Sequence, residues 1–258
     1  MALQAEQTPA RAVTGAVYDG QLSQRRSDRT ARAAFRELVV HLAPPGATLL
    51  DFGSGTGTDA RFYAERGFRV QAYDVDPDMC DSFEANCRNE IEAGRITLLR
   101  GTYESFLKRD NSAPGGTDLV ASNFAPLNLL ESLRDLFAAF YALTAPGGKV
   151  LASVLSPYFL GDLRYRWWWR NLPALVRDGR YSVAGAQGPI VRRGLADLAA
   201  QAEPFFVLER AYRDSAPPTP QAARSSWSAR GLGTWLPFAT CRYMFLQFAR
   251  RNGVASHH

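Results

Sequence analysis

Three glycines at alternate positions follow an apolar run in the stretch LLDFGSGTGTDA, residues 49–60. Glycine has no Cβ, so glycines at this density indicate that other atoms approach the backbone closely. The segment LLDF is typical of a buried strand, and TDARFYAERG is typical of a helix that ends at Gly67. The glycines therefore form the turn of a strand–turn–helix unit, and the question is what this turn holds.

The residues around the glycines distinguish three classes of ligand. A phosphate-binding P-loop needs the pattern G-x-x-x-x-G-K-[ST], and no lysine lies near this turn. A dinucleotide fingerprint, G-x-G-x-x-G, places its third glycine at position 58, which is a threonine here. The observed spacing is Asp51-x-Gly53-x-Gly55-x-Gly57. Because a carboxylate repels pyrophosphate and attracts an ammonium group, the pattern favours a zwitterionic ligand.

A second acid ends the next predicted strand. The segment FRVQAYDV follows the helix, and Asp74 lies about 20 residues after the glycines, where an acid can accept hydrogen bonds from two ribose hydroxyls. S-adenosylmethionine has an amino acid end and an adenosine end. Its ammonium group suits Asp51, and its ribose hydroxyls suit Asp74.

The rest of the chain repeats the alternation of strands and helices. Strands are expected at 47–52, 68–75, 95–101, 117–124, 147–155, 204–212 and 238–250, and helices at 19–43, 58–67, 77–94, 129–143 and 192–202. Short apolar strands alternating with helices indicate a parallel sheet covered on both faces. Residues 156–193 fit no such repeat, and 214–231 are expected to form a loop.

Four segments in order resemble the successive motifs of class I S-adenosylmethionine-dependent methyltransferases, in the form found in bacterial enzymes that act on small metabolites. They are LLDFGSGTGTDA, VQAYDVDPDM, DLVASNFAPLN and LTAPGGKVLA, and the resemblance covers roughly residues 15–155. It implies a Rossmann-like, seven-stranded, mostly parallel sheet with an antiparallel last strand, helices on both faces and an insertion after strand five. We expect a single domain over 1–258, with an N-terminal helical cap at 1–45 and a substrate-side insertion at 156–193.

The resemblance also implies a cofactor, S-adenosyl-L-methionine, with S-adenosyl-L-homocysteine as its product, and residues that hold it. Asp51, Gly53, Ser54, Gly55 and Gly57 are expected at the methionine end, Asp74 at the ribose, Val75 and Met79 beside the adenine, and Asn123 and Phe124 between cofactor and acceptor. Thr102 and Tyr103 stand where the family usually has an acid facing the adenine amino group. Tyr18 is either a cofactor lid or an ordinary packing aromatic.

The acceptor pocket is expected to come from three segments. They supply Arg25 and Arg26 from the N-terminal segment, Asn128 from the tip of strand four, and Tyr158, Arg164 and Trp167 from the insertion. Asn128 is also a typical helix cap, and the run RYRWWWRN (164–171) is also typical of a lid helix or an interfacial anchor. His41, the one internal histidine, is expected at the amino edge of the sheet, away from ligands. No catalytic base and no metal ligands are therefore named.

Charge divides the chain unevenly. Residues 1–155 hold 16 Lys/Arg and 19 Asp/Glu, a net of −3, whereas residues 156–258 hold 14 and 6, a net of +8. This asymmetry favours an anionic partner at the C-terminal part. The predicted acceptor is a small aromatic or hydrophobic metabolite that is anionic or carrier-bound, with methyl transfer to oxygen or nitrogen. Peripheral membrane contact is a further expectation of the Trp run.

Two other functions stay open on the sequence. The basic half suits an RNA methyltransferase, although the tip of strand four lacks the PP-aromatic motif of enzymes that methylate flipped bases. A non-catalytic S-adenosylmethionine-binding accessory protein is the second alternative. The N-terminus has no apolar segment of a signal peptide, and the three cysteines show no metal-type spacing, so free thiols in a cytoplasmic protein are expected.

Overall fold

The computed structural model describes residues 26–109, 116–185, 188–214 and 238–252. Its helices are α2 (Arg26–Leu42), α3 (Thr58–Ala64), α4 (Pro77–Asn86), α5 (Arg88–Glu92), α6 (Tyr103–Leu107), η1 (Pro126–Leu129), α7 (Arg134–Leu143), η2 (Leu160–Asp162), α8 (Arg166–Asp178) and α9 (Leu195–Ala202). Its strands are β1 (Thr48–Phe52), β2 (Arg69–Tyr73), β3 (Ile96–Leu99), β4 (Thr117–Ser122), β5 (Thr144–Leu155), β6 (Arg180–Gly185), β7 (Gly188–Arg193), β8 (Phe206–Arg213) and β9 (Tyr243–Arg250).

Seven strands form one sheet in the order β3-β2-β1-β4-β5-β9-β8. Neighbours from β3 to β5 pair in parallel, and β9 is antiparallel to both β5 and β8. The predicted fold class, with an antiparallel last strand, is confirmed. Starting from β1, the chain adds β2 and then β3 on one side of the sheet, and it later adds β4 and β5 on the other side of β1. The strand order therefore reverses between β1 and β4. Ligands of open α/β sheets bind outside the carboxyl ends of the strands at such a point.

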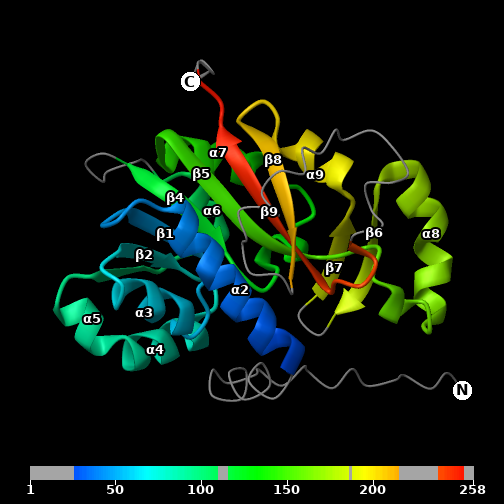
Figure 1. The fold of residues 1–258 in the computed structure, drawn as a ribbon. Coiled ribbons are helices and arrows are strands. Elements are labelled where there is room, and N and C mark those ends of the chain that lie inside the picture. Colours follow the sequence, from blue (N-terminus) through cyan, green and yellow to red (C-terminus); the bar gives the residue numbers. More distant parts are fainter. Residues whose placement is uncertain (1–25, 110–115, 186–187, 215–237, 253–258) are drawn as a thin grey trace, which may run out of the picture.

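The sheet separates two apolar cores because successive strand residues face opposite sides. Leu49 of β1 and its register partner Leu119 of β4 belong to the core under α2 and α3. The next pair, Leu50 and Val120, belongs to the core under α7 and α9. Figure 1 shows these helices on the two faces of the sheet. Each fully buried side chain of this kind stabilises the fold by about 1.5–3 kcal/mol. Burial of apolar side chains therefore holds the helices of both layers against the sheet.

Several element boundaries differ from those expected. The helix expected over 77–94 is two helices, because Cys87, with φ −111° and ψ 17°, interrupts it. The helix expected over 129–143 begins only at Arg134. The last strand begins at Tyr243 rather than at 238. Residues 19–25 of the first expected helix and most of the 214–231 loop lie outside the described residues.

The insertion after β5 is a helix on a hairpin. Strands β6 and β7 pair antiparallel as a separate two-stranded sheet, and α8 packs on β6. The Asn128 side chain joins this hairpin to the main sheet: its Nδ2 donates to the Val191 carbonyl (2.6 Å), and its Oδ1 accepts from the Leu155 amide (3.0 Å). Asn128 is buried, and both ends of its amide are thus used to hold the chain together.

A buried arginine fastens the same hairpin to the loop after β4. Arg193 is 1% exposed, and its guanidinium donates to the carbonyl oxygens of Leu130 (2.6 Å) and Glu131 (2.7 Å). Its Nε lies 3.4 Å from a carboxylate oxygen of Asp197. Burial lowers the pKa of Arg193. A charge removed from water needs such partners, so Arg193 holds the insertion and the loop in one arrangement.

We expect Arg193→Met to lower the free energy of unfolding by about 3–5 kcal/mol, because the substitution removes the donor to the Leu130 and Glu131 carbonyls and the ionic partner of Asp197. Denaturant unfolding monitored by circular dichroism measures this loss. Arg180→Met, on the exposed surface of the same hairpin, should change stability by less than about 0.5 kcal/mol. Equal losses in the two variants would show that the Arg193 contacts carry no special weight.

Candidate functional site

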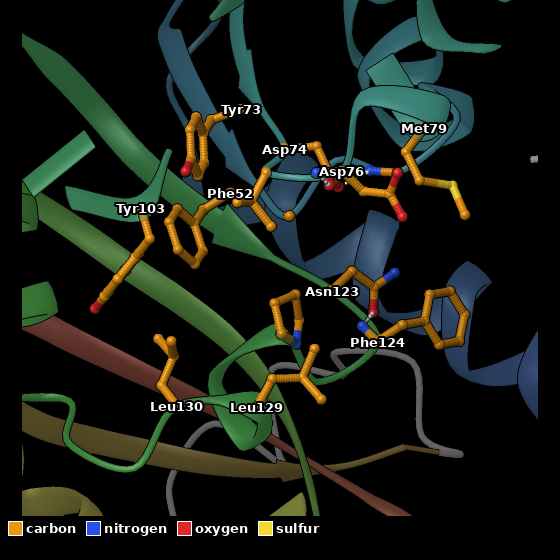
Figure 2. A pocket seen from close by; sticks show the side chains of 14 residues that line it. Phe52, Tyr73, Asp74, Asp76, Met79, Tyr103, Asn123, Phe124, Leu129 and Leu130 are labelled. Atoms are coloured by element: carbon orange, nitrogen blue, oxygen red, sulfur yellow. Dashed lines mark hydrogen bonds between the residues drawn. The ribbon is translucent and has the colours of Figure 1, made fainter. Parts of the chain in front are cut away.

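Two adjoining cavities open at the carboxyl edge of β1, β2 and β4. The larger, of about 420 Å³, is lined by Phe52, Gly53, Gly55, Tyr73, Asp74, Val75, Asp76, Met79, Tyr103, Asn123, Phe124, Pro126, Leu129 and Leu130. The smaller, of about 20 Å³, is lined by Arg32, Asp51, Gly53, Ser54, Gly55, Thr56, Thr58, Asp59, Asn123 and Phe124. Figure 2 shows the larger cavity, with Asp74, Asp76 and Met79 on one side and Leu129 and Leu130 on the other. The cavities share four residues, so one elongated ligand can occupy both.

The glycine turn is held in place by its own chain. The amides of Gly53 and Ser54 both donate to the Tyr73 carbonyl, at 2.8 and 3.0 Å. Gly53 and Gly57 have φ of +73° and +85°, and a Cβ would lie 2.4 Å from Pro126 at the first and 2.5 Å from the Cys87 sulfur at the second. What approaches these two glycines is therefore protein. Gly53 and Gly55 both line the two cavities, so a ligand there lies against their backbone.

Asp51 places an unpartnered carboxylate oxygen beneath this turn. The residue is 2% exposed, and its Oδ2 is buried with no hydrogen-bond partner. Burial, followed by the charges of Asp59 and Asp74, raises the pKa of Asp51 well above its usual range. The arginines 32 and 36 oppose this rise only in part. A buried carboxylate without a partner is costly, and a bound cation would relieve that cost.

Asp59 organises the other side of the smaller cavity. Its Oδ1 accepts from Arg36 Nε (2.6 Å), and its Oδ2 accepts from Asn123 Nδ2 (2.9 Å). Arg32 Nε lies 3.6 Å from the same carboxylate and has no hydrogen-bond partner. Asn123 Oδ1 accepts from the Phe124 amide (2.9 Å), which fixes the tip of β4. Arg32 can therefore turn its free N–H toward an anionic group in the smaller cavity.

The sequence analysis missed Asp59, Arg32 and Arg36. A sequence pattern could have indicated the two arginines: Arg32 and Arg36 are four residues apart, so they lie on one face of a helix. The predicted N-terminal cations, Arg25 and Arg26, lie about two to three helical turns earlier. Tyr18 and Arg25 lie outside the described residues, and only the backbone of Arg26 is described.

Asp74 connects the turn to the larger cavity. Its Oδ2 accepts from the Gly55 amide (2.7 Å), and its Oδ1 accepts from the Asp76 amide (3.0 Å). Burial raises the pKa of Asp74 in spite of these bonds. A carboxylate oxygen has two lone pairs, so each oxygen can accept one further hydrogen bond from a ligand. Val75 and Met79 continue the wall on the same side.

The chain after β4 is strained where it borders both cavities. Phe124 and Ala125 have φ of +58° and +66°, the left-handed conformation that side chains other than those of Gly, Asn and Asp rarely adopt. The Phe124 ring packs edge-on against Tyr243, at 5.7 Å between centroids, and the Arg32 guanidinium lies 4.8 Å above it. Such strain costs about 1–3 kcal/mol per residue and gathers at functional sites.

Most of the residues predicted to hold the cofactor meet at these cavities. The cavities bring together Asp51, Gly53, Ser54, Gly55, Asp74, Val75, Met79, Tyr103, Asn123 and Phe124. Gly57 and Thr102 line neither. Thr102 instead caps α6, since its Oγ1 accepts from the Ser105 amide (3.2 Å).

The predicted acceptor residues are not brought to the cavities. The amide of Asn128 is used within the fold, as described above. Trp167 is stacked between the rings of Tyr165 and Tyr181, at 5.9 and 6.3 Å. Arg164 lies over the Tyr165 ring (4.8 Å), and Tyr158 packs against Gly194. Their role in acceptor binding stays a prediction.

The described walls of the two cavities offer carboxylates and phenols, but no histidine, as candidate bases. His41 is exposed in the last turn of α2, just before β1, and none of the described residues lining the two cavities is a histidine. Burial raises the pKa of both Tyr73 and Tyr103 to about 12, so their phenols stay neutral near pH 7.

Comparison with known proteins agrees with this geometry. A sequence model of the methyltransferase domain matches residues 18–184. The chain belongs to this methyltransferase family. The family resemblance, and with it the class of S-adenosylmethionine-dependent enzymes and their cofactor, is confirmed for the matched part.

Individual relatives are more distant. A malonyl-[acyl-carrier protein] O-methyltransferase from Serratia marcescens is 33% identical over 132 residues, 51% of this chain and 48% of that protein. The chain thus spans about half the length of such curated relatives. The CcbJ methyltransferase of Streptomyces caelestis has a similar structure (TM-score 0.61, 18% identity, 95% of this chain and 99% of that chain). So does a Burkholderia thailandensis 1,6-didemethyltoxoflavin-N1-methyltransferase solved with S-adenosylhomocysteine (TM-score 0.55, 18% identity, 97% and 94%).

Asp51→Asn is expected to stabilise the protein without cofactor at neutral pH. The folded-state pKa of Asp51 lies above its unfolded value of about 3.9. The folded protein therefore binds this proton more tightly, and wild-type stability falls as pH rises through that interval. The asparagine variant escapes this loss, so it should gain about 1–3 kcal/mol over wild type near pH 7 and little near pH 4. Thermal unfolding from pH 4 to 8 measures the difference, with the exposed Asp81→Asn as control. A difference that does not vary with pH would contradict the assignment.

Proposed function

We propose that the chain binds S-adenosylmethionine across the two cavities and methylates the carboxylate of a small acid carried on an acyl carrier protein. The observation that carries the cofactor pose is the unpartnered Oδ2 of Asp51. Asp51, Asp59 and Asp74 surround a space that favours positive charge, and the cofactor brings an ammonium and a sulfonium.

The shapes of the cavities support one orientation of the cofactor. The smaller, polar cavity suits the amino acid end, with Asp51 toward the ammonium and Arg32 toward the carboxylate. The larger cavity suits the adenosine, with Asp74 toward the ribose hydroxyls and Val75 and Met79 along the base. The residues shared by the two cavities then lie near the sulfur, where Asn123 and Phe124 form the wall.

The chemistry of the wall supports a carboxylate acceptor. When bound, the cofactor supplies an electrophilic methyl group on a sulfonium. A carboxylate attacks such a group without a base, whereas a hydroxyl usually needs one. The described cavity wall offers neither a histidine nor an ionised phenol at neutral pH. The protein's contribution is then alignment of the reacting atoms and exclusion of water.

The names of the relatives support the carrier. Several curated relatives at 28–33% identity are malonyl-[acyl-carrier protein] O-methyltransferases. The excess of positive charge after residue 155 suits an acidic carrier. In the described part of the chain, no helix has the length and apolar character needed to cross a membrane. The cysteines 80, 87 and 241 are buried and form no disulfide with one another, which supports the proposed cytoplasmic location.

Asp74→Ala is expected to weaken cofactor binding by about 1–3 kcal/mol, because hydrogen bonds to a charged group are lost. Isothermal titration calorimetry with S-adenosylhomocysteine measures the change. Asp81→Ala serves as the control, since Asp81 is exposed on α4 and lines neither cavity. If Asp74→Ala binds as tightly as wild type, the ribose assignment is wrong, and tight binding of NAD would contradict the cofactor itself.

The acceptor is tested by mass spectrometry. Purified protein, S-adenosylmethionine and malonyl-acyl carrier protein should yield a carrier whose mass has increased by one methylene, on the free carboxyl of the malonyl group. Acetyl-acyl carrier protein, which lacks that carboxylate, should remain unchanged. Methylation of RNA but not of the malonyl carrier would replace the proposal with the RNA alternative.

A further inference from the structure

We infer that the outward face of α8 is a docking surface for an acidic carrier protein that presents the acceptor. The inference rests on the carrier-bound form of the proposed function and assigns the contact to side chains outside the cofactor cavities. The surface consists of Arg166, Trp169, Arg170, Pro173, Val176 and Arg177, all of which are exposed.

These residues form two parallel rows. At 3.6 residues per turn, Arg166, Arg170 and Arg177 lie along one row, and Trp169, Pro173 and Val176 lie along the adjacent row. Trp167, Trp168 and residues 171, 172, 174 and 175 are partly buried, Asp178 at the end of the helix is exposed, and α8 packs on β6. From residue 166 to 177 the rows span about 16 Å. A partner helix with carboxylates beside apolar side chains fits such a surface.

The apolar row is unusually exposed for a folded protein. Trp169 is 57% exposed and Val176 is 79% exposed. Trp169 is nevertheless held in one orientation, because its Nε1 donates to the Leu163 carbonyl (2.8 Å) and its ring packs edge-on against Trp168 (5.0 Å). A rigid aromatic side chain loses little entropy on binding, and Trp and Arg are the residues that most often dominate interfaces.

The positive charge of this region is not neutralised locally. The insertion contains seven arginines and two aspartates. One aspartate, Asp162, pairs with Arg192 inside the insertion, and the other, Asp178, pairs with Arg177. Among the described residues, Arg166 and Arg170 take part in no ion pair.

A protein partner fits this surface better than a lipid one. A helix that lies in a membrane buries a broad apolar face. Here the exposed apolar row is one side chain wide and has arginines beside it, and the remaining apolar side chains of α8 are partly buried. Charge complementarity along a row also sets the register of a protein partner, which increases specificity.

Packing and hydrogen bonds connect α8 to the wall of the larger cavity. α8 sits on β6, and β7 is fastened through Asn128 and Arg193 to the loop that follows β4. That loop supplies Pro126, Leu129 and Leu130 to the wall of the larger cavity. Figure 1 shows α8 at the end of the molecule opposite α4 and α5. A carrier held at α8 is therefore fixed relative to the wall past which its attached acid must reach.

The test measures binding of a carrier that has no acyl group, so that contact is separated from chemistry. Apo-acyl carrier protein is titrated into the full chain, and Arg166→Glu/Arg170→Glu should weaken binding by about tenfold or more, as should Trp169→Ala. Arg69→Glu/Arg88→Glu makes the same change in net charge at exposed sites away from α8 and should change affinity less than twofold. Higher salt should weaken wild-type binding, because exposed charges are screened, while affinity for S-adenosylhomocysteine stays constant in every variant.

Several outcomes would overturn the inference. One is an equal effect of the α8 variants and the control pair on carrier binding. Another is a loss of binding to phosphatidylglycerol vesicles in the α8 variants while carrier binding stays intact. A third is a wild-type dimer, seen by light scattering, that these variants dissociate. Failure of the proposed function looks different: the apo-carrier still binds through α8, but the malonyl-carrier is never methylated.

Discussion

The arrangement of the site depends on one buried, unpartnered carboxylate. Asp51 is the penultimate residue of β1, at the point where the strand order reverses, and its Oδ2 has no hydrogen-bond partner. The charges of Asp59 and Asp74 increase the cost of ionising it, and Arg32 and Arg36 reduce that cost only partly. In the protein without ligand, this cost lowers the free energy of unfolding. Under the proposed function, a ligand that brings an ammonium and a sulfonium relieves this cost on binding, which favours cations over phosphates at the site.

Packing within the protein fixes the elements around Asp51. Gly53 admits Pro126, and Gly57 admits Cys87 and Phe83, so two of the three glycines in the turn serve contacts within the protein. Pro126 in turn belongs to the loop that Arg193 fastens to the insertion hairpin. The turn, the loop and the insertion thus form a continuous packed unit. This continuity gives a contact at α8 a physical route to the cavity wall.

Much of the site could be predicted from local sequence. Asp51 and Asp74 each end an apolar strand, and the carboxyl ends of neighbouring parallel strands meet at one edge of a sheet. Their placement at two adjoining cavities, Asp51 at the smaller and Asp74 at the larger, therefore follows from strand order alone. Gly57 and Thr102 show the limit of carrying residues over by position, because the structure uses them in helix packing and helix capping. The acceptor residues of the insertion could not be placed, because that segment follows no repeating βα pattern.

The sequence by itself determined the sheet, its two cores and the acids at its edge. These features arise from the period-two alternation of strands and from residues adjacent in the chain. Only the tertiary structure decided which side chains from distant parts of the chain meet around that edge. Arg36 meets Asp59 across 23 residues, Asn123 meets it across 64, and Arg193 reaches Leu130 across 63. Such pairs depend on how helices and loops pack against the finished sheet, and no local pattern in the chain encodes that geometry.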